Sequence, residues 1–195
     1  MRGRSDPAAA LLSGVQNADA PPRMNVFLVG PMGSGKSAVG RQLAQRLALE
    51  FIDSDAEIEA RTGVDIAYIF EREGEAGFRS REAEVIDAIS RRDRVLVSTG
   101  GGAVLDAGTR ERLRTRGRVV YLRTSVDQQL ARTRRSNDRP LLNNDDPRGT
   151  LERLFEQRAP LYTEVAEIVV DTDGRKVKTV VDHICRQLGV DGPRP

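Results

Sequence analysis

The segment from Gly30 to Ser37 reads GPMGSGKS, a glycine-rich run that ends in a lysine and a serine. Glycines let backbone N–H groups turn inward around phosphate oxygens. A lysine at this spacing reaches the β- and γ-phosphates of a nucleotide, and the serine hydroxyl is a ligand for Mg²⁺. The spacing therefore predicts a phosphate-binding loop. Its expected nucleotide-binding residues are Gly33, Ser34, Gly35, Lys36, Ser37 and Ala38.

The sequence on either side supports this loop. The continuous apolar run Asn25–Val29 is typical of a buried strand, and Lys36–Leu49 has the apolar spacing of a helix. A helix that begins at this point directs the positive end of its dipole at the phosphates. The alternative is a glycine-rich turn that matches the pattern by chance, and the strand–loop–helix order disfavours it.

A second chemical signal is Asp53-Ser54-Asp55, at the end of the expected strand Glu50–Asp53. Residues i and i+2 of an extended segment point the same way, and ligands bind outside the carboxyl ends of parallel strands. One acid can support Mg²⁺ while the other accepts hydrogen bonds from substrate hydroxyls. The alternative is a helix N-cap before Ala56–Thr62, which needs only one of the two acids. The spacing alone leaves both interpretations open.

The phosphate loop by itself leaves GTPases, ATPases and kinases open. The chain has no obvious Asn-Lys-x-Asp signature for guanine, and the expected strand Val95–Ser98 runs into Thr-Gly-Gly-Gly instead of an acid that could hold Mg²⁺. The metal-supporting carboxylate is therefore expected within Asp53-Ser54-Asp55.

Strand and helix signals alternate along the chain, which predicts a parallel sheet covered by helices on both faces. The expected strands are Asn25–Val29, Glu50–Asp53, Val95–Ser98, Arg118–Leu122 and Ile168–Val170. The expected helices are Lys36–Leu49, Ala56–Thr62, Glu75–Ser90, Asp106–Thr115, Ser125–Arg134, Thr150–Ala159 and Lys176–Leu188. The fold class is thus α/β, with three α/β/α layers of which a five-stranded parallel sheet is the middle one.

Composition sets the domain organisation and excludes several classes. One domain over residues 24–189 is expected, between a disordered tail of residues 1–23 and a second tail of residues 190–195, with a mobile lid at about 135–149. The 31 Lys+Arg nearly cancel the 29 Asp+Glu, which disfavours a nucleic-acid binder. No apolar run approaches the ~20 residues of a membrane span. Cys185 is the only cysteine, so a reducing, cytoplasmic location is expected.

Several motifs occur in order between Asn25 and Leu188, and together they resemble the shikimate kinase family. After the phosphate loop they are Val39-Gly40, Phe51-Ile52-Asp53-Ser54-Asp55, Phe78-Arg79-x-x-Glu82, Ser98-Thr99-Gly100-Gly101-Gly102, Arg139-Pro140-Leu141-Leu142 and Arg158-Ala159-Pro160-Leu161-Tyr162. The resemblance implies a P-loop fold like that of the nucleoside monophosphate kinases. It also implies transfer of the γ-phosphoryl group of ATP to the 3-hydroxyl of shikimate, in aromatic amino acid biosynthesis, with Mg²⁺ as cofactor and a monomeric enzyme.

The resemblance also implies roles for individual residues. The acceptor is expected to contact Asp55, Arg79, Gly101, Gly102 and Arg158, with the two arginines on its carboxylate. Asp53 and Ser37 are the expected Mg²⁺ ligands. Arg132 is expected to stack on adenine with help from Arg175, and Arg139 to reach the transferring phosphate from the lid. The implied catalytic residues are Lys36, Asp55 and Arg139.

The residues support one of these roles independently. Leu151, Leu154, Phe155 and Arg158 follow helical spacing, so Arg158 continues the apolar face inward and needs an anion there. The alternative is an arginine that snorkels to solvent at a helix end. For Arg79, Glu82 either fixes its orientation or forms an ordinary surface pair with it.

Two other classes of function stay open at this point. One is a different small-acceptor kinase, such as a gluconate kinase, or less readily a nucleoside monophosphate kinase. The other is a nucleotide-binding regulatory or RNA-binding module without transferase activity. Release of ADP with shikimate, gluconate, AMP or no acceptor distinguishes them.

Overall fold

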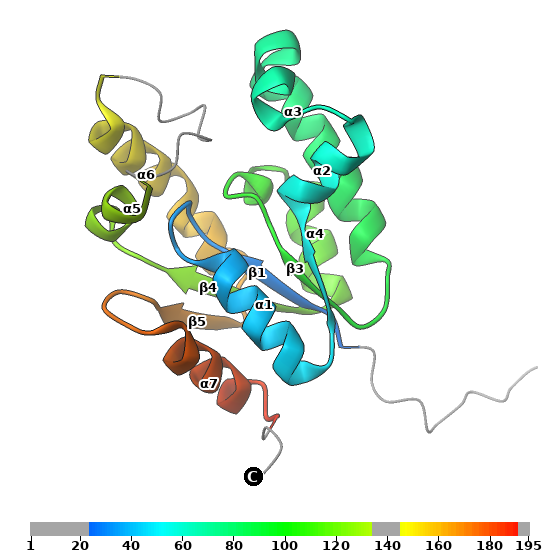
Figure 1. Cartoon of the computed structure of the whole chain (residues 1–195), viewed down its shortest axis with the longest axis vertical. Coiled ribbons are helices and arrows are strands. Elements are labelled where there is room, and N and C mark those ends of the chain that lie inside the picture. Colours follow the sequence, from blue (N-terminus) through cyan, green and yellow to red (C-terminus); the bar gives the residue numbers. More distant parts are fainter. Residues whose placement is uncertain (1–23, 134–144, 191–195) are drawn as a thin grey trace, which may run out of the picture.

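The computed structural model describes residues 24–133 and 145–190. Within these ranges the chain forms one five-stranded sheet in the order β2-β3-β1-β4-β5, and every neighbouring pair is parallel (Figure 1). The strands are β1 (Val26–Val29), β2 (Glu50–Asp53), β3 (Val95–Ser98), β4 (Arg118–Arg123) and β5 (Ile168–Asp171). The predicted fold class is therefore confirmed.

Helices cover both faces of this sheet, as expected for parallel strands joined by crossovers. They are α1 (Lys36–Leu47), α2 (Ser54–Thr62), α3 (Ile66–Ser90), α4 (Ala107–Arg116), α5 (Val126–Thr133), α6 (Pro147–Val165) and α7 (Val177–Gln187), with the short 3₁₀ turn η2 (Ala103–Leu105). Helices α1 and α7 pack together on one face. Helices α3, α4 and α6 contribute to the core on the other face.

The central strand β1 shows why its sequence is continuously apolar. Val26 and Leu28 belong to the core cluster beneath α1 and α7, while Phe27 and Val29 belong to the opposite cluster. All four residues are fully buried. Because successive side chains point to opposite faces, a strand between two helical layers needs an apolar residue at every position.

Two helices are longer than the sequence indicated. Helix α3 begins at Ile66 instead of Glu75 and passes through Gly74, whose backbone is non-helical at φ 70°. Asp65 caps its start, since the Asp65 side chain accepts a hydrogen bond from the Tyr68 N–H at 2.7 Å. Glycine accepts this positive φ at no steric cost, so the kink separates a first helical stretch from the strongly apolar second stretch.

Helix α6 begins at Pro147 and continues past Pro160 to Val165, whereas the expected helix covered only Thr150–Ala159. Its first turn is capped by Asp146, whose carboxylate accepts a hydrogen bond from the Gly149 N–H at 2.9 Å. Tyr162 and Val165, both buried, keep the helix in place beyond the proline. Burial of these side chains outweighs the helix-breaking tendency of an internal proline.

In residues 24–133 and 145–190, no helix is both long enough and apolar enough to cross a membrane. Of the expected lid at about 135–149, residues 135–144 lie outside the described residues, and Pro147–Gly149 form the first turn of α6.

Candidate active site

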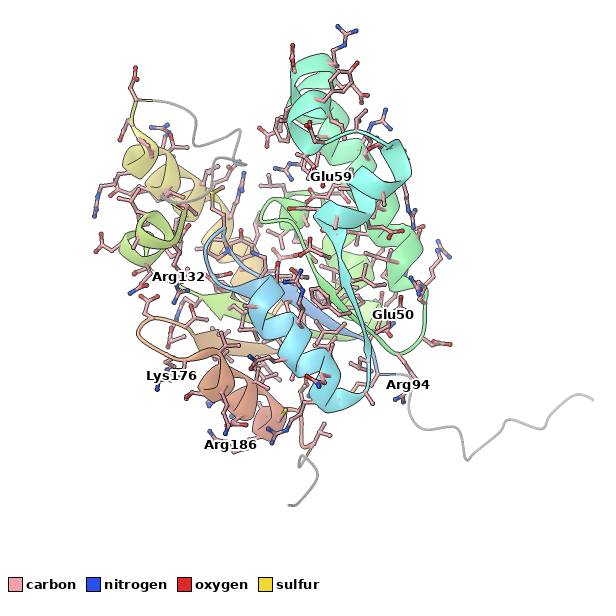
Figure 2. All side chains as sticks on the ribbon, in the orientation of Figure 1. Glu50, Glu59, Arg94, Arg132, Lys176 and Arg186 are labelled. Carbon is pink, nitrogen blue, oxygen red and sulfur yellow. The ribbon has the colours of Figure 1, made fainter. Side chains whose placement is uncertain are left out.

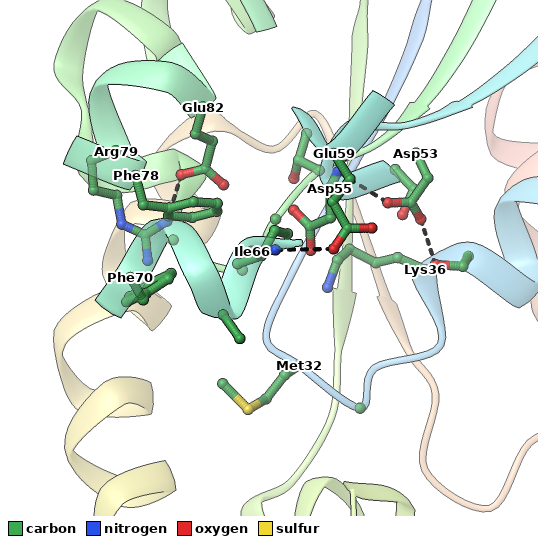
Figure 3. Close-up of a pocket in the computed structure, with 18 of the residues that line it drawn as sticks. Met32, Lys36, Asp53, Asp55, Glu59, Ile66, Phe70, Phe78, Arg79 and Glu82 are labelled. Atoms are coloured by element: carbon green, nitrogen blue, oxygen red, sulfur yellow. Dashed lines mark hydrogen bonds and ion pairs between the residues drawn. The ribbon is translucent and has the colours of Figure 1, made fainter. Parts of the chain in front are cut away.

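A cavity of about 900 Å³ lies beyond the carboxyl ends of β1, β2 and β3, where ligands of parallel sheets bind. Its walls come from the phosphate loop, α2, α3, α5, α6 and the glycine loop after β3 (Figure 3). Figure 2 shows Glu59 on the α2 side and Arg132 on the α5 side. The predicted site residues that line it are Gly33, Gly35, Lys36, Ser37, Ala38, Asp53, Asp55, Arg79, Gly101, Gly102, Arg132 and Arg158.

The phosphate loop is built mainly from backbone. Gly33 and Gly35 have φ of 75° and 91°, conformations that glycine adopts without strain. Gly35 is the N-cap of α1 and provides no side-chain cap, so the first N–H groups of the helix are left for a ligand. Lys36 is buried and its Nζ donates to the carbonyls of Gly30 at 2.7 Å and Pro31 at 2.9 Å. The lysine thus fixes the curvature of the loop around its own ammonium group.

Asp53 combines the two roles that the sequence left open. The Ser37 hydroxyl donates to one Asp53 oxygen at 2.7 Å, and the other Asp53 oxygen accepts the Asp55 N–H at 3.2 Å as the N-cap of α2. Hydroxyl and carboxylate oxygens are the donors that Mg²⁺ takes from proteins, so this pair fits the ion. Among the described residues, no group of three or more His, Cys, Asp or Glu side chains could hold a metal. Mg²⁺ usually takes only one or two ligands from the protein and the others from phosphate oxygens and water, so a small set of protein ligands is enough.

The local geometry at Asp55 differs from the one expected. Asp55 lies in the first turn of α2 and not in an extended segment, because helix α2 begins at Ser54. It still faces the cavity. The Ser54 hydroxyl accepts the Gly100 N–H at 2.9 Å, which fastens α2 to the glycine loop. A Cβ at Gly100 would lie 2.9 Å from an Asp55 oxygen and 2.1 Å from a Glu82 oxygen, so the loop leaves room only for glycine there.

Arg79 is held by two carboxylates on α3. Its Nη1 donates to Glu82 at 2.5 Å and its Nη2 to Glu75 at 3.1 Å. Glu82 is only 2% exposed, and its Oε1 has no hydrogen-bond partner among the described residues. Burial raises the pKa of Glu82 to about 7, against the opposing pull of Arg79. The ion pair is therefore a positioned, partly buried one and not the ordinary surface pair considered above.

Arg158 points into the protein from α6. The residue is 4% exposed, and its Nε has no partner among the described residues. Desolvation and the neighbouring Arg79 lower the pKa of its guanidinium, although an arginine remains charged at any ordinary pH. This burial excludes the snorkelling alternative. Two guanidinium groups, Arg79 and Arg158, thus line one side of the cavity and create a site for a small anion.

Of the predicted residues Ser34, Arg132 and Arg175, only Arg132 lines the cavity. Arg132 donates to the Gly33 carbonyl at 2.9 Å and to the Thr172 carbonyl at 3.2 Å, so it is tied to the phosphate loop. Ser34 is buried beneath the loop and does not line the cavity. Arg175 is exposed and lies outside the cavity lining. Arg139 lies outside the described residues.

Some lining residues were not anticipated as site residues. They are Met32, Glu59, Asp65, Ile66, Ala67, Phe70, Phe78, Glu82, Ser98, Thr99 and Gly100. Phe70 and Phe78 pack with ring centroids 4.8 Å apart and form an apolar part of the wall. Phe70 lies in the first stretch of α3, before the kink at Gly74. An aspartate that can cap a helix, Asp65, precedes this stretch in the sequence, but no helix was predicted to begin there.

Comparisons with known proteins agree with this geometry. The sequence profile of the shikimate kinase family matches residues 32–189. Shikimate kinase from Shewanella amazonensis is 54% identical over 167 residues, covering 86% of this chain and 98% of the relative. A relative of the same name from Shewanella oneidensis is 55% identical over the same share of each chain.

Solved structures show the same relationship. Shikimate kinase from Acinetobacter baumannii, in complex with shikimate, superimposes with a TM-score of 0.84 at 46% identity, covering 86% of this chain and 93% of that one. A gluconokinase from Sinorhizobium meliloti, at 19% identity and a TM-score of 0.55, shares the fold. On the family profile, the sequence identity and the phosphate-loop cavity taken together, this chain belongs to the shikimate kinase family, whose members are ATP-dependent kinases.

Proposed function

We propose that this chain transfers the γ-phosphoryl group of ATP to the 3-hydroxyl of shikimate, which gives shikimate 3-phosphate and ADP. One observation carries the assignment of roles within the site. A single cavity joins a phosphate loop to two inward-facing arginines, with Asp55 also in its lining. This arrangement suits a small carboxylated polyol next to a nucleoside triphosphate.

The phosphate side of the cavity acts through position and charge. Lys36 holds the β- and γ-phosphates and neutralises charge that develops during transfer. Gly33, Ser34, Gly35 and Ala38 surround the phosphates, mainly through backbone N–H groups. Ser37 and Asp53 would hold Mg²⁺, which supplies further neutralisation of phosphate charge when bound. No covalent intermediate with the protein is required, because phosphoryl transfer has a loose transition state.

The acceptor side recognises shikimate through side chains. Arg79 and Arg158 bind its carboxylate with charge-assisted hydrogen bonds, and the backbone of Gly101 and Gly102 lines its ring. Asp55 accepts hydrogen bonds from ring hydroxyls, orients the 3-hydroxyl towards the γ-phosphate and takes its proton late in the transfer. Binding both reactants in one cavity converts a bimolecular encounter into a positioned reaction.

Other roles follow the family pattern. Arg132 stacks on adenine, supported by Arg175, and Arg139 contributes positive charge to the transferring phosphate from a lid at about 135–149. Closure of that lid excludes water and suppresses ATP hydrolysis. We further propose that residues 24–189 form a single catalytic domain between two tails, and that the enzyme is a cytoplasmic monomer that binds neither nucleic acid nor membrane.

The proposal is tested by ADP release from purified protein in the presence of Mg²⁺ and ATP. Shikimate, gluconate, AMP and no acceptor are compared under identical conditions. We expect release only with shikimate, and phosphorus NMR of the product should place the new phosphate on the 3-hydroxyl. Faster release with gluconate or AMP, or the same release without any acceptor, would contradict the assignment.

A further inference from the structure

Tyr162 lies behind the acceptor side of the cavity and is fully buried. It occupies α6 four residues after Arg158, so both side chains project from the same face of that helix. The Tyr162 hydroxyl donates a hydrogen bond to the Gly101 carbonyl. The Arg158 guanidinium is a charged neighbour of the same phenol. One buried phenol therefore lies between two groups of the acceptor side: it is hydrogen-bonded to the glycine loop and lies beside the guanidinium of Arg158.

The chemistry of a phenol suits this position between a carbonyl and a guanidinium. Its single O–H donates to the carbonyl, and its oxygen lone pairs remain available to an arginine N–H. Burial keeps the phenol neutral, since desolvation raises the pKa of Tyr162 well above its ordinary value. A neutral hydroxyl remains a donor to Gly101 at every pH at which the protein works.

Gly101 lines the cavity, so a hydrogen bond that fixes its peptide also fixes part of the cavity wall. A Cβ at Gly101 would lie 3.4 Å from the Met32 N and 3.7 Å from the Tyr162 oxygen, so the glycine loop is packed between the phosphate loop and Tyr162. The peptide whose carbonyl Tyr162 holds also carries the Gly102 N–H. A hydrogen bond at the carbonyl end of a peptide fixes its plane and polarises its N–H.

We infer that Tyr162 is a positioning residue for the acceptor, since its hydroxyl holds the Gly101–Gly102 peptide and its ring lies beside Arg158 on the same face of α6. This inference rests on the proposed shikimate kinase activity. Tyr162 touches neither reactant and acts only through the Gly101–Gly102 peptide that it holds and the Arg158 guanidinium beside it.

The neighbouring Tyr121 provides a matched control. Its ring packs against Tyr162 with centroids 5.0 Å apart, and it is only 1% exposed. Its hydroxyl, however, has no hydrogen-bond partner among the described residues. Tyr121→Phe and Tyr162→Phe therefore each remove one phenol oxygen from the same aromatic pair. Only Tyr162→Phe removes a hydrogen bond to the glycine loop.

The test compares the KM values of both substrates in the wild type, Tyr162→Phe and Tyr121→Phe. Tyr162→Phe should raise the KM for shikimate about tenfold, as expected when a buried carbonyl loses its hydrogen-bond donor, and leave the KM for ATP within about twofold. Tyr121→Phe should leave both values within about twofold. An unchanged KM for shikimate in Tyr162→Phe, or equal effects of the two variants, would overturn the inference.

Two further measurements separate positioning from stability. Calorimetric titration with a non-hydrolysable ATP analogue counts the folded sites in each preparation, so a shikimate affinity referred to that count is independent of partial unfolding. In an Arg158→Ala background, Tyr162→Phe should add less than about threefold to the KM for shikimate, because the guanidinium that Tyr162 helps to position is already lost. A full tenfold effect there would refute action through Arg158. Wild-type turnover of shikimate is measured in parallel, so failure of the proposed function itself is recognised separately.

Discussion

The two sides of the cavity are built in different ways. The phosphate side comes largely from one continuous segment, Gly30–Ser37, whose binding groups are mainly backbone N–H groups and one buried lysine. The acceptor side combines side chains from α2, α3 and α6 with the glycine loop after β3. Asp55, Arg79 and Arg158 are far apart in the sequence, and only the sheet order brings them to one edge.

This difference explains what each side recognises. A backbone loop with a helix N-terminus binds any suitably placed phosphate chain, so it does not choose the acceptor. A set of buried charged side chains rejects a ligand that leaves them unpaired, because their desolvation is then uncompensated. Specificity for shikimate is therefore expected to depend on the acceptor side, and turnover on both sides. The variants below test that division.

The largest loss is expected from Lys36→Met on the phosphate side. Removing the ammonium group takes away charge that stabilises the transferring phosphate, so kcat should fall by about 10²–10³-fold. The KM for shikimate should change by less than about threefold. Steady-state kinetics with each substrate varied in turn provide both values. A KM for shikimate that rises as steeply as kcat falls would show that the two sides are not separate.

Asp55→Asn tests the catalytic part of the acceptor side. The amide keeps the shape of the side chain but is a weaker proton acceptor, so kcat should fall by about 10²-fold. ATP binding, measured by calorimetric titration, should stay near the wild-type value. Wild-type turnover in Asp55→Asn would remove this residue from the mechanism.

Arg158→Ala tests recognition without chemistry on the phosphate. If this buried guanidinium binds the carboxylate as proposed, its loss should raise the KM for shikimate by about 30–100-fold, as expected for charge-assisted hydrogen bonds. The KM for ATP serves as the internal control and should change little. An unchanged KM for shikimate would mean that Arg158 does not contact the acceptor.

The smallest effect is expected for the pH dependence of stability in Glu82→Gln. The folded-state pKa of Glu82, about 7, lies above the ordinary carboxyl value of 4.5. Between these values the folded protein binds more protons than the unfolded chain, so Glu82 makes the free energy of unfolding fall as pH rises from 4.5 to 7. Urea unfolding at several pH values measures this free energy. Between pH 4.5 and 7 its change with pH should be more negative in the wild type than in Glu82→Gln, by a total on the order of 2 kcal/mol. Identical slopes would contradict the burial of this carboxyl.

The difference between the contiguous phosphate side and the dispersed acceptor side also explains how much of the structure could be predicted from the sequence. The phosphate loop was assigned from spacing because its binding groups are contiguous, and the alternation of strands and helices predicted the sheet. The missed start of α3 depends on a short cap at Asp65 and a kink at Gly74, which no apolar periodicity marks. The extent of α6 past Pro160 depends on burial of Tyr162, a long-range contact. The inward direction of Arg158 was predicted from helical spacing, but its nearness to Arg79 required the fold.

Recognition of the acceptor carboxylate by Arg158 is tested most directly by comparing shikimate with its primary amide, which has nearly the same shape and no charge. The measured quantity is the ratio of kcat/KM for the two acceptors in the wild type and in Arg158→Ala. The wild type should prefer shikimate by about 100-fold. The variant should lose about tenfold of that preference, because it lacks one of the two guanidinium groups proposed to bind the carboxylate. The same ratio in both proteins would show that Arg158 does not read the carboxylate and would contradict the division between the two sides of the cavity.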